Sequence, residues 1–339
     1  MRKTKPYYVH LPAQCHGLTS LAAKWDSDRA RKASQINVDL TSLESIDIVA
    51  LVVFIARLRI FLESVDAQSV RVELPTSPKV LSFLSRLGAL NWFENLNKLQ
   101  HGPDLFETTE EKQENEASRY ELLLTDPPRV KQALWLLNAS SSKSRQDWIV
   151  YFRRELRGLL DSQAECDFGR EQLYIIVTEL VKNTIDHSGK DAYLGLELLM
   201  DESDRRILRM QFVFCELGDG ISSSIRRYLG SLQGETHEHA ELKRLAMKGA
   251  IADLLRLAFK PDFTTKPESG VNFGVGLNLI LQGARGVGMS CMLLDSHSAV
   301  NLSSLDSKLP LSHTSVRSGS TGLVVSPPLT FVFEWEASR

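Results

Sequence analysis

The feature that most constrains this chain is an apolar helical stretch that begins near Gly169 and carries polar side chains along one stripe. Glu179 and Asn183 are one helical turn apart, and Asp186 and His187 follow one turn later, so these side chains project toward roughly the same face. The other side of the helix is apolar and would anchor it: Leu173, Ile176, Val177 and Leu180. Acids, a carboxamide and an imidazole on one helix face suggest a site where oxygen ligands, a metal ion and water meet.

Length and composition are those of an ordinary globular protein. At 339 residues the chain is long enough for two domains, each with its own core. Hydrophobic residues make up 43% and charged residues 24%, and a formal charge of −2 gives no basic field, so nucleic-acid binding is not indicated. The cysteines lack C-x-x-C spacing, which favours reduced core residues over zinc or disulfides: Cys15, Cys166, Cys215 and Cys291.

No membrane or secretory segment is expected. The basic N-terminus is not followed by an apolar stretch, which argues against a secretory signal. The longest apolar run, residues 46–62, is interrupted by Asp47, Arg57 and Arg59 and is too short and too charged to span a bilayer. We therefore expect a cytoplasmic protein.

The chain is expected to hold two domains separated by a linker. Residues 1–98 alternate strands (36–40 and 69–74) with helices (47–63 and 79–87), which favours an α/β unit with a parallel strand pair. Residues 99–125 are acidic and poor in apolar side chains, as in a linker. Residues 126–339 form the second domain.

The first domain resembles a STAS domain, the fold of anti-sigma-factor antagonists, over roughly residues 5–98. The resemblance lies in the segment from Val38 to Asp47, which an apolar helix follows. In that family a phosphorylatable serine commonly follows the aspartate that matches Asp47, but this chain has Ile48 and Val49 there. The resemblance therefore implies a scaffold or interaction element rather than a phosphorylation switch. Ser45 lies on the other side of Asp47, and we interpret it as a turn residue.

The second domain is expected to mix helices and strands in the following order. Helices are predicted from Pro127 through the apolar run at 133–137, then at 146–160, at 169–187, within the charged stretch 221–260, and after a glycine-rich loop at 272–284. Residues 303–322 are serine-rich and are predicted to be a loop. Strands are predicted at 193–199, 206–214, 289–294, 299–302 and 330–335.

Three segments of this domain suit a nucleotide site. The first is Glu179-x-x-x-Asn183; the second, Glu216-Leu-Gly-Asp-Gly-Ile221, follows an apolar strand; the third, Gly274-Val-Gly-Leu277, opens a helix. An asparagine oxygen is a suitable Mg²⁺ ligand, and a glutamate one turn earlier can act as a general base. A carboxylate at a strand end can accept a hydrogen bond from an exocyclic amine, and glycines at a helix N-terminus expose N–H groups to phosphate.

Their order resembles the N, G1 and G2 boxes of the GHKL superfamily, which includes DNA gyrase, heat-shock chaperones, histidine kinases and MutL. The resemblance covers about residues 145–336 and implies a Bergerat fold, a two-layer α/β sandwich with a mixed sheet. It implies ATP and Mg²⁺ as cofactors, with Asn183 on the metal, Glu179 as the catalytic base, Glu216 reading adenine, and residues 221–273 as a lid. The remaining residues expected at the nucleotide are Asp186, Gly218, Gly220, Ile221, Lys266, Gly274, Gly276 and Leu277.

One position departs from the family pattern. The adenine-reading residue is usually aspartate, whereas Glu216 is one methylene longer and must fold back to hold the same distance. We keep Glu216 rather than Asp219 in this role because Asp219 would break the Gly-x-Gly register.

The leading functional hypothesis is a signalling switch that binds and hydrolyses ATP, whose lid, ordered by Mg²⁺-ATP, controls a protein partner or self-association as a homodimer. The partner is unidentified and would be reached through the STAS-like domain. The alternatives are a serine kinase of the anti-sigma type, acting on a STAS-domain partner, and an adaptor that binds nucleotide without turnover. Histidine kinase is the least favoured, and no Ser-His-Asp or Cys-His grouping emerges from the sequence.

Overall fold

A computed structural model gives the architecture of the chain. It divides into two compact units, one built mainly from residues 1–136 and the other mainly from residues 137–339. The expected linker, residues 99–125, lies outside the described residues. The structure describes residues 5–17, 27–33, 35–65, 70–98, 130–139, 141, 143–160, 169–201, 207–231, 244, 251–260, 276–295, 298–302, 313–315 and 328–337.

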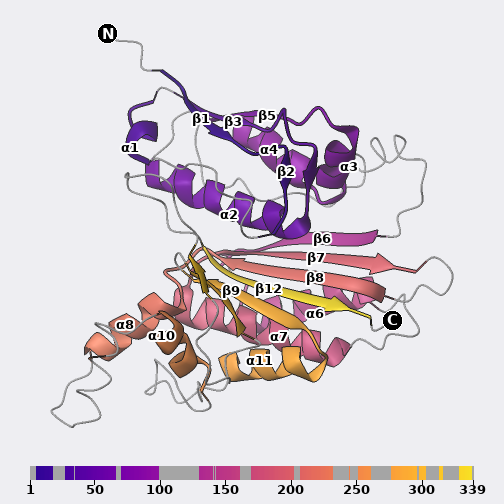
Figure 1. Ribbon diagram of the computed structural model, residues 1–339, viewed down its shortest axis with the longest axis vertical. Helices are drawn as coiled ribbons and strands as arrows, with labels where there is room; N and C mark the ends of the chain where they lie inside the picture. Colours follow the sequence, from indigo (N-terminus) through magenta and orange to yellow (C-terminus); the bar gives the residue numbers. More distant parts are fainter. Residues whose placement is uncertain are drawn as a thin grey trace. The chain divides into compact units, whose positions relative to one another are not determined.

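The first unit is organised on a small parallel sheet (Figure 1). Its strands are β1 (Tyr7–His10), β3 (Ile36–Asp39) and β5 (Val70–Glu73), in that order, and both neighbouring pairs are parallel. The expected parallel pair is therefore confirmed. A second, two-stranded parallel sheet joins β2 (Gln14–Cys15) to β4 (Ser45–Ile46).

Helices connect and cover these strands: α1 (Ser27–Ala30), α2 (Ile48–Val65), α3 (Pro78–Arg86) and α4 (Ala89–Lys98). The α2 helix begins where Asp47 accepts a hydrogen bond from the Ala50 N–H at 2.7 Å, as an N-cap residue does. Proline opens α3, and Gly88, with φ of 67°, follows its end. The helices predicted at 47–63 and 79–87 are thus confirmed to within two residues.

The chain from Val130 onward forms a seven-stranded sheet with the strand order β11-β10-β9-β12-β8-β7-β6. The pairs of β12 with β8 and with β9, and of β10 with β9 and with β11, are antiparallel. Its strands are β6 (Val130–Leu137), β7 (Ala192–Met200), β8 (Ile207–Glu216), β9 (Ser290–Asp295), β10 (Ser298–Asn301), β11 (His313–Ser315) and β12 (Leu329–Glu336).

Two sequence predictions for this part of the chain are wrong. The run at 133–137, predicted to be helical, belongs to strand β6, because a short apolar run suits either structure and sheet pairing decides between them. The serine-rich segment predicted to be a loop contains β11, which pairs with β10.

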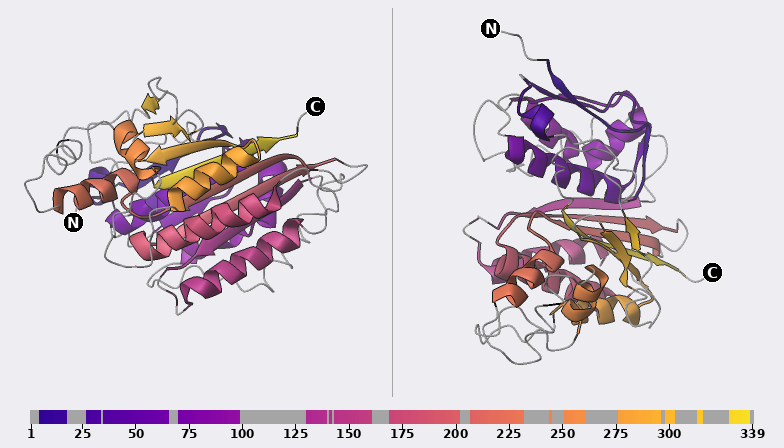
Figure 2. Two further views of the ribbon diagram at one scale, coloured as in Figure 1. Left: turned by 90° about the horizontal axis from the view of Figure 1, so that it is seen from below. Right: turned by 60° about the vertical axis from the view of Figure 1, so that its left-hand side comes forward.

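Helices line one face of the seven-stranded sheet, so this part of the chain has two layers (Figures 1 and 2). The α6 (Arg145–Leu160), α7 (Arg170–Asn183) and α11 (Gly276–Gly286) helices lie side by side, with α7 between the other two. Two further helices, α8 (Ile221–Ser231) and α10 (Ile251–Ala258), pack on each other. The α/β class is confirmed. No helix among the described residues is long and apolar enough to cross a membrane.

Candidate functional site

The α7 helix does not end at Asn183 but widens into a π-helical turn, η1 (Thr184–Ser188). The turn closes at Gly189, whose φ is 60° and whose N–H donates to the Thr184 carbonyl at 2.8 Å. Single π turns recur at functional sites because they change the directions in which side chains leave a helix. Here the widened turn supplies two hydroxyls, from Thr184 and Ser188, to the residues that end β8.

The first residue of α11 lies directly against the polar face of α7. A Cβ atom at Gly276 would be 3.0 Å from Glu179 Oε2 and 3.3 Å from Asn183 Oδ1. Two turns along α11, a Cβ at Gly283 would be 3.3 Å from Ile176 Cγ1. Two glycines on one side of α11 therefore allow its close approach to α7, and the approach brings residues of the first and third predicted segments together.

The polar side chains of Asn183 and Glu179 differ in their hydrogen-bond partners within the protein. The Asn183 Nδ2 atom is buried and has no hydrogen-bond partner among the described residues. Glu179 instead accepts a hydrogen bond on Oε1 from Lys182 Nζ at 2.7 Å, while its Oε2 faces Gly276. Lys182 was not among the expected site residues, and its three-residue spacing from Glu179 is the sequence signal for this ion pair.

Glu216, the last residue of β8, is buried, with a relative exposure of 7%. Its Oε2 atom lies 3.2 Å from Thr184 Oγ1. Burial is the main cause that raises the pKa of the Glu216 carboxyl above its ordinary value of 4.5. Hydrogen bonds from Ser188 and Thr184 oppose the shift, and the nearby charges of Asp295 and Asp219 add to it. The surroundings therefore favour the neutral form of this carboxyl group more than water does, which raises its pKa.

The loop after β8 has no room for side chains at its glycines. A Cβ at Gly218 would be 2.5 Å from Glu216 Oε1 and 2.6 Å from Ser188 Oγ. The glutamate thus folds back over its own loop, as its extra methylene requires. Gly220 has a φ of 85°, and a Cβ there would be 2.5 Å from Asp295 Oδ1.

Asp295, the last residue of β9, is a member of this site that sequence reasoning missed. It is fully buried, and its Oδ2 accepts a hydrogen bond from the Ser222 N–H at 2.7 Å. One oxygen therefore bonds the first turn of α8, and the other lies close to Gly220. The available signal was an acid that directly ends an apolar strand, the same pattern that drew attention to Glu216.

The other expected residues are placed as follows. Asp186 forms an ion pair with Arg145, the first residue of α6, at 2.6 Å. This carboxylate therefore has a partner within the protein. Ile221 is the first residue of α8, and Leu277 is the second of α11. Gly274 and Lys266 lie outside the described residues, as does most of the expected lid, of which α8, α10 and a few further residues are described.

Searches of protein-family models, curated proteins and solved structures gave no match for this chain. The geometry places a buried carboxyl group, a carboxamide with a buried nitrogen, and a helix N-terminus around one helix.

Proposed function

We propose that the second unit binds Mg²⁺-ATP on the polar face of α7 and acts as a nucleotide-controlled switch. The observation that carries this proposal is the close approach of Gly276 to Glu179 and Asn183, which leaves no free space for a side chain at Gly276. A ligand that carries phosphate and a metal ion needs polar side chains to bind the metal. It also needs a helix N-terminus whose backbone N–H groups a glycine leaves accessible to phosphate. A purely structural helix contact would be better served by apolar side chains at these positions.

The chain's donors fit Mg²⁺ better than a metal held by protein alone. No group of three or more His, Cys, Asp or Glu side chains in the described part of the chain is placed to hold a metal ion. Mg²⁺ commonly keeps several waters and binds nucleotide phosphates with one or two protein oxygens. Asn183 Oδ1, which faces Gly276 at the start of α11, would supply that oxygen. Bound there, Mg²⁺ would neutralise phosphate charge.

The remaining roles belong to residues already placed around α7. The Glu216 carboxyl would orient the base by accepting from its exocyclic amine, with Thr184 and Ser188 fixing the side chain. The N–H groups in the first turn of α11 have no acceptor inside the helix, which suits them to phosphate oxygens. Glu179 would take a proton from the attacking water, and Lys182 would hold its carboxylate in place.

Asn183→Ala tests the binding site. We expect it to abolish the thermal stabilisation that Mg²⁺-ATP gives the wild type. The protein without nucleotide should be no less stable than wild type, because the substitution removes a buried donor that costs about 1–3 kcal/mol when unpaired. Gln282→Ala removes an exposed carboxamide on α11 and is the matched control. Equal ATP stabilisation of Asn183→Ala and wild type would remove Asn183 from the site.

Glu179→Gln tests turnover with γ-labelled ATP. We expect the variant to bind ATP but to release labelled phosphate about a hundredfold more slowly, the usual scale for loss of a general base. Glu171→Gln, in the exposed first turn of α7, should behave as wild type. Label transferred to protein instead of released would favour the kinase alternative, and binding without any turnover would favour the adaptor.

A further inference from the structure

The first unit brings a histidine, His16, next to a serine and an aspartate, Ser45 and Asp47, that lie about thirty residues further along the chain. Strand β2 pairs with β4 in parallel, with Cys15 opposite Ile46. Continuing this register by one residue sets His16 beside Asp47, and the Asp47 N–H donates to the Cys15 carbonyl at 3.2 Å. Residue order alone does not reveal this grouping, because the pairing of β2 with β4 creates it.

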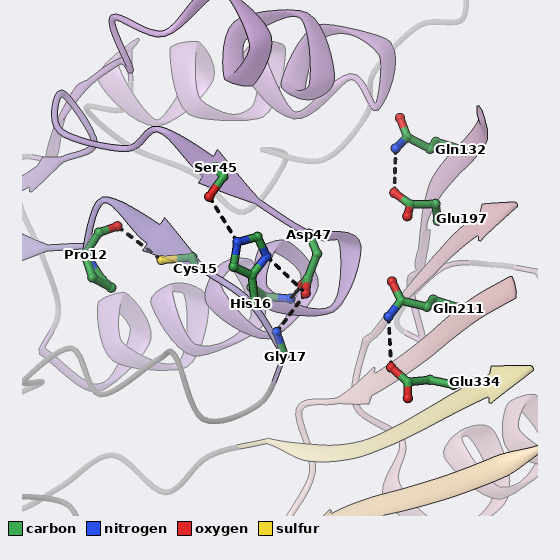
Figure 3. A network of polar contacts seen from close by, with 11 residues as sticks. Pro12, Cys15, His16, Gly17, Ser45, Asp47, Gln132, Glu197, Gln211 and Glu334 are labelled. Atoms are coloured by element: carbon green, nitrogen blue, oxygen red, sulfur yellow. Dashed lines mark hydrogen bonds and ion pairs between the residues drawn. The ribbon is translucent and has the colours of Figure 1, made fainter. Parts of the chain in front are cut away.

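The three side chains lie in the order of a nucleophile, a base and an orienting acid (Figure 3). His16 Nε2 lies 3.0 Å from Ser45 Oγ. The other ring nitrogen, Nδ1, lies 3.6 Å from Asp47 Oδ2. This arrangement, with one imidazole nitrogen on a hydroxyl and the other toward a carboxylate, is what activates serine in unrelated hydrolytic folds.

Asp47 is held rigidly while the histidine and serine remain accessible. Its Oδ1 accepts from the Ala50 N–H at 2.7 Å, and its Oδ2 accepts from the Gly17 N–H at 2.8 Å. The side chain of His16 is 57% exposed, against 20% for Asp47. A ligand in solution can therefore reach the imidazole and the hydroxyl, but the acid beneath them stays fixed.

The needs of the local fold do not account for this contact. The turn before α2 is held by main-chain bonds, including one of 3.1 Å from the Ser45 N–H to the Ala13 carbonyl. The helix cap uses Asp47 Oδ1 alone. Neither interaction requires a hydroxyl at Ser45 or an imidazole at His16.

We propose that Ser45 is a nucleophile that takes acyl groups from small carboxylic esters, with His16 as its general base and Asp47 as a positioning residue. Ser45 Oγ attacks the ester carbonyl carbon and passes its proton to His16 Nε2. The new C–O bond remains when the ester C–O bond breaks, and the leaving alkoxide takes the proton from His16. Water then attacks the acyl-serine in the same way, which releases the carboxylic acid and restores the hydroxyl.

The experiment uses the full chain and a fluorophosphonate, which reacts with activated serines by forming a P–O bond and releasing fluoride. Intact-mass spectrometry should find one adduct on the wild type, and peptide mapping should place it on Ser45. Ser45→Ala should give none. Ser42→Ala removes an exposed serine that bonds the Leu11 carbonyl and should leave labelling unchanged. An unlabelled wild type, or an adduct that survives in Ser45→Ala, overturns the proposal.

His16→Ala separates activation from simple exposure of the serine. We expect labelling to slow about a hundredfold, as for loss of a general base, and added imidazole to restore much of the rate. A loss of folding could not be rescued in this way. Release of nitrophenol from p-nitrophenyl acetate should follow the same order of variants. Labelling of His16→Ala at the wild-type rate would show that the imidazole does not activate Ser45 and would overturn the mechanism.

Discussion

At the scale of single residues, the second unit keeps polar groups where the fold gains little from them. Asn183 Nδ2 is buried and unpaired among the described residues, and Glu216 is buried beside further acids. An unpaired buried donor such as Asn183 Nδ2 costs about 1–3 kcal/mol, and the burial of the Glu216 carboxyl also costs free energy, so a protein without use for these groups would be more stable with apolar replacements. Such local costs are characteristic of sites kept for binding.

Glu216 makes the stability of the protein depend on pH. Because the pKa of its carboxyl group is raised in the folded state, the folded protein holds this proton more tightly than the unfolded chain, whose value is near 4.5. The free energy of unfolding should therefore fall as pH rises above 4.5, toward the raised pKa of the folded state. Glu216→Gln should remove this part of the pH dependence, as measured by urea unfolding in a series of buffers.

Glu197→Gln offers a control for that series, since it changes a half-buried carboxylate that accepts a hydrogen bond from the Gln132 amide. It should leave the decline above pH 4.5 in place. An unchanged slope in Glu216→Gln would mean that Glu216 is ionised in the folded protein across this range.

At the scale of elements, we expect the separation of α7 and α11 to control the proposed ATP site. Gly283 holds the two helices close, and Gly276 at the end of the same helix faces Asn183. A larger side chain at Gly283 should therefore push α11 away from α7 and shift Gly276. Gly283 itself touches none of the polar residues proposed to bind ATP.

Gly283→Leu tests this coupling. Overpacking against Ile176 should lower the free energy of unfolding by about 1–3 kcal/mol and weaken the stabilisation by Mg²⁺-ATP. Gly158→Leu places the same side chain in α6, where a Cβ meets nothing within 4 Å, and should be neutral or stabilising. Urea unfolding with and without nucleotide measures both effects. Full ATP stabilisation in Gly283→Leu would separate the helix contact from the site.

The elements also indicate what a sequence can predict here. The α2 and α7 helices are long, α2 being apolar almost throughout and α7 having an apolar side, so their positions followed from the sequence pattern. Strand β6 did not, because a five-residue apolar run is ambiguous without knowledge of its neighbours. The π turn at Thr184 leaves no signal in residue order. The contacts of Asp295 and of Ser45 with His16 arise from strand pairing, which brings together residues that are distant in the chain.

At the scale of the whole molecule, each proposed site draws its residues from one unit. The ATP site uses described residues between 145 and 295, and the serine site uses residues between 16 and 47. We therefore expect ATP binding and the reactivity of Ser45 to persist when the chain between the two units is cut.

A protease recognition sequence inserted within residues 99–125 tests this independence. After cleavage, stabilisation by Mg²⁺-ATP and fluorophosphonate labelling should both persist at the wild-type level, because β6 stays attached to the rest of its sheet. The intact insertion variant is the control for the inserted sequence itself. Loss of either response on cleavage would show that its site needs the covalent connection.

Strand β12 has a consequence for the way this protein is made. It is the last strand of the described chain, yet it lies between β8 and β9 in the sheet (Figure 1). On the ribosome, β8 and β9 are therefore synthesised before β12. The edges that pair with β12 stay unpaired until β12 has been made. Open edges of this kind invite pairing with other chains. The nascent protein should depend on chaperones until synthesis reaches residue 336, and a premature stop before residue 329 should yield aggregates rather than a smaller folded protein.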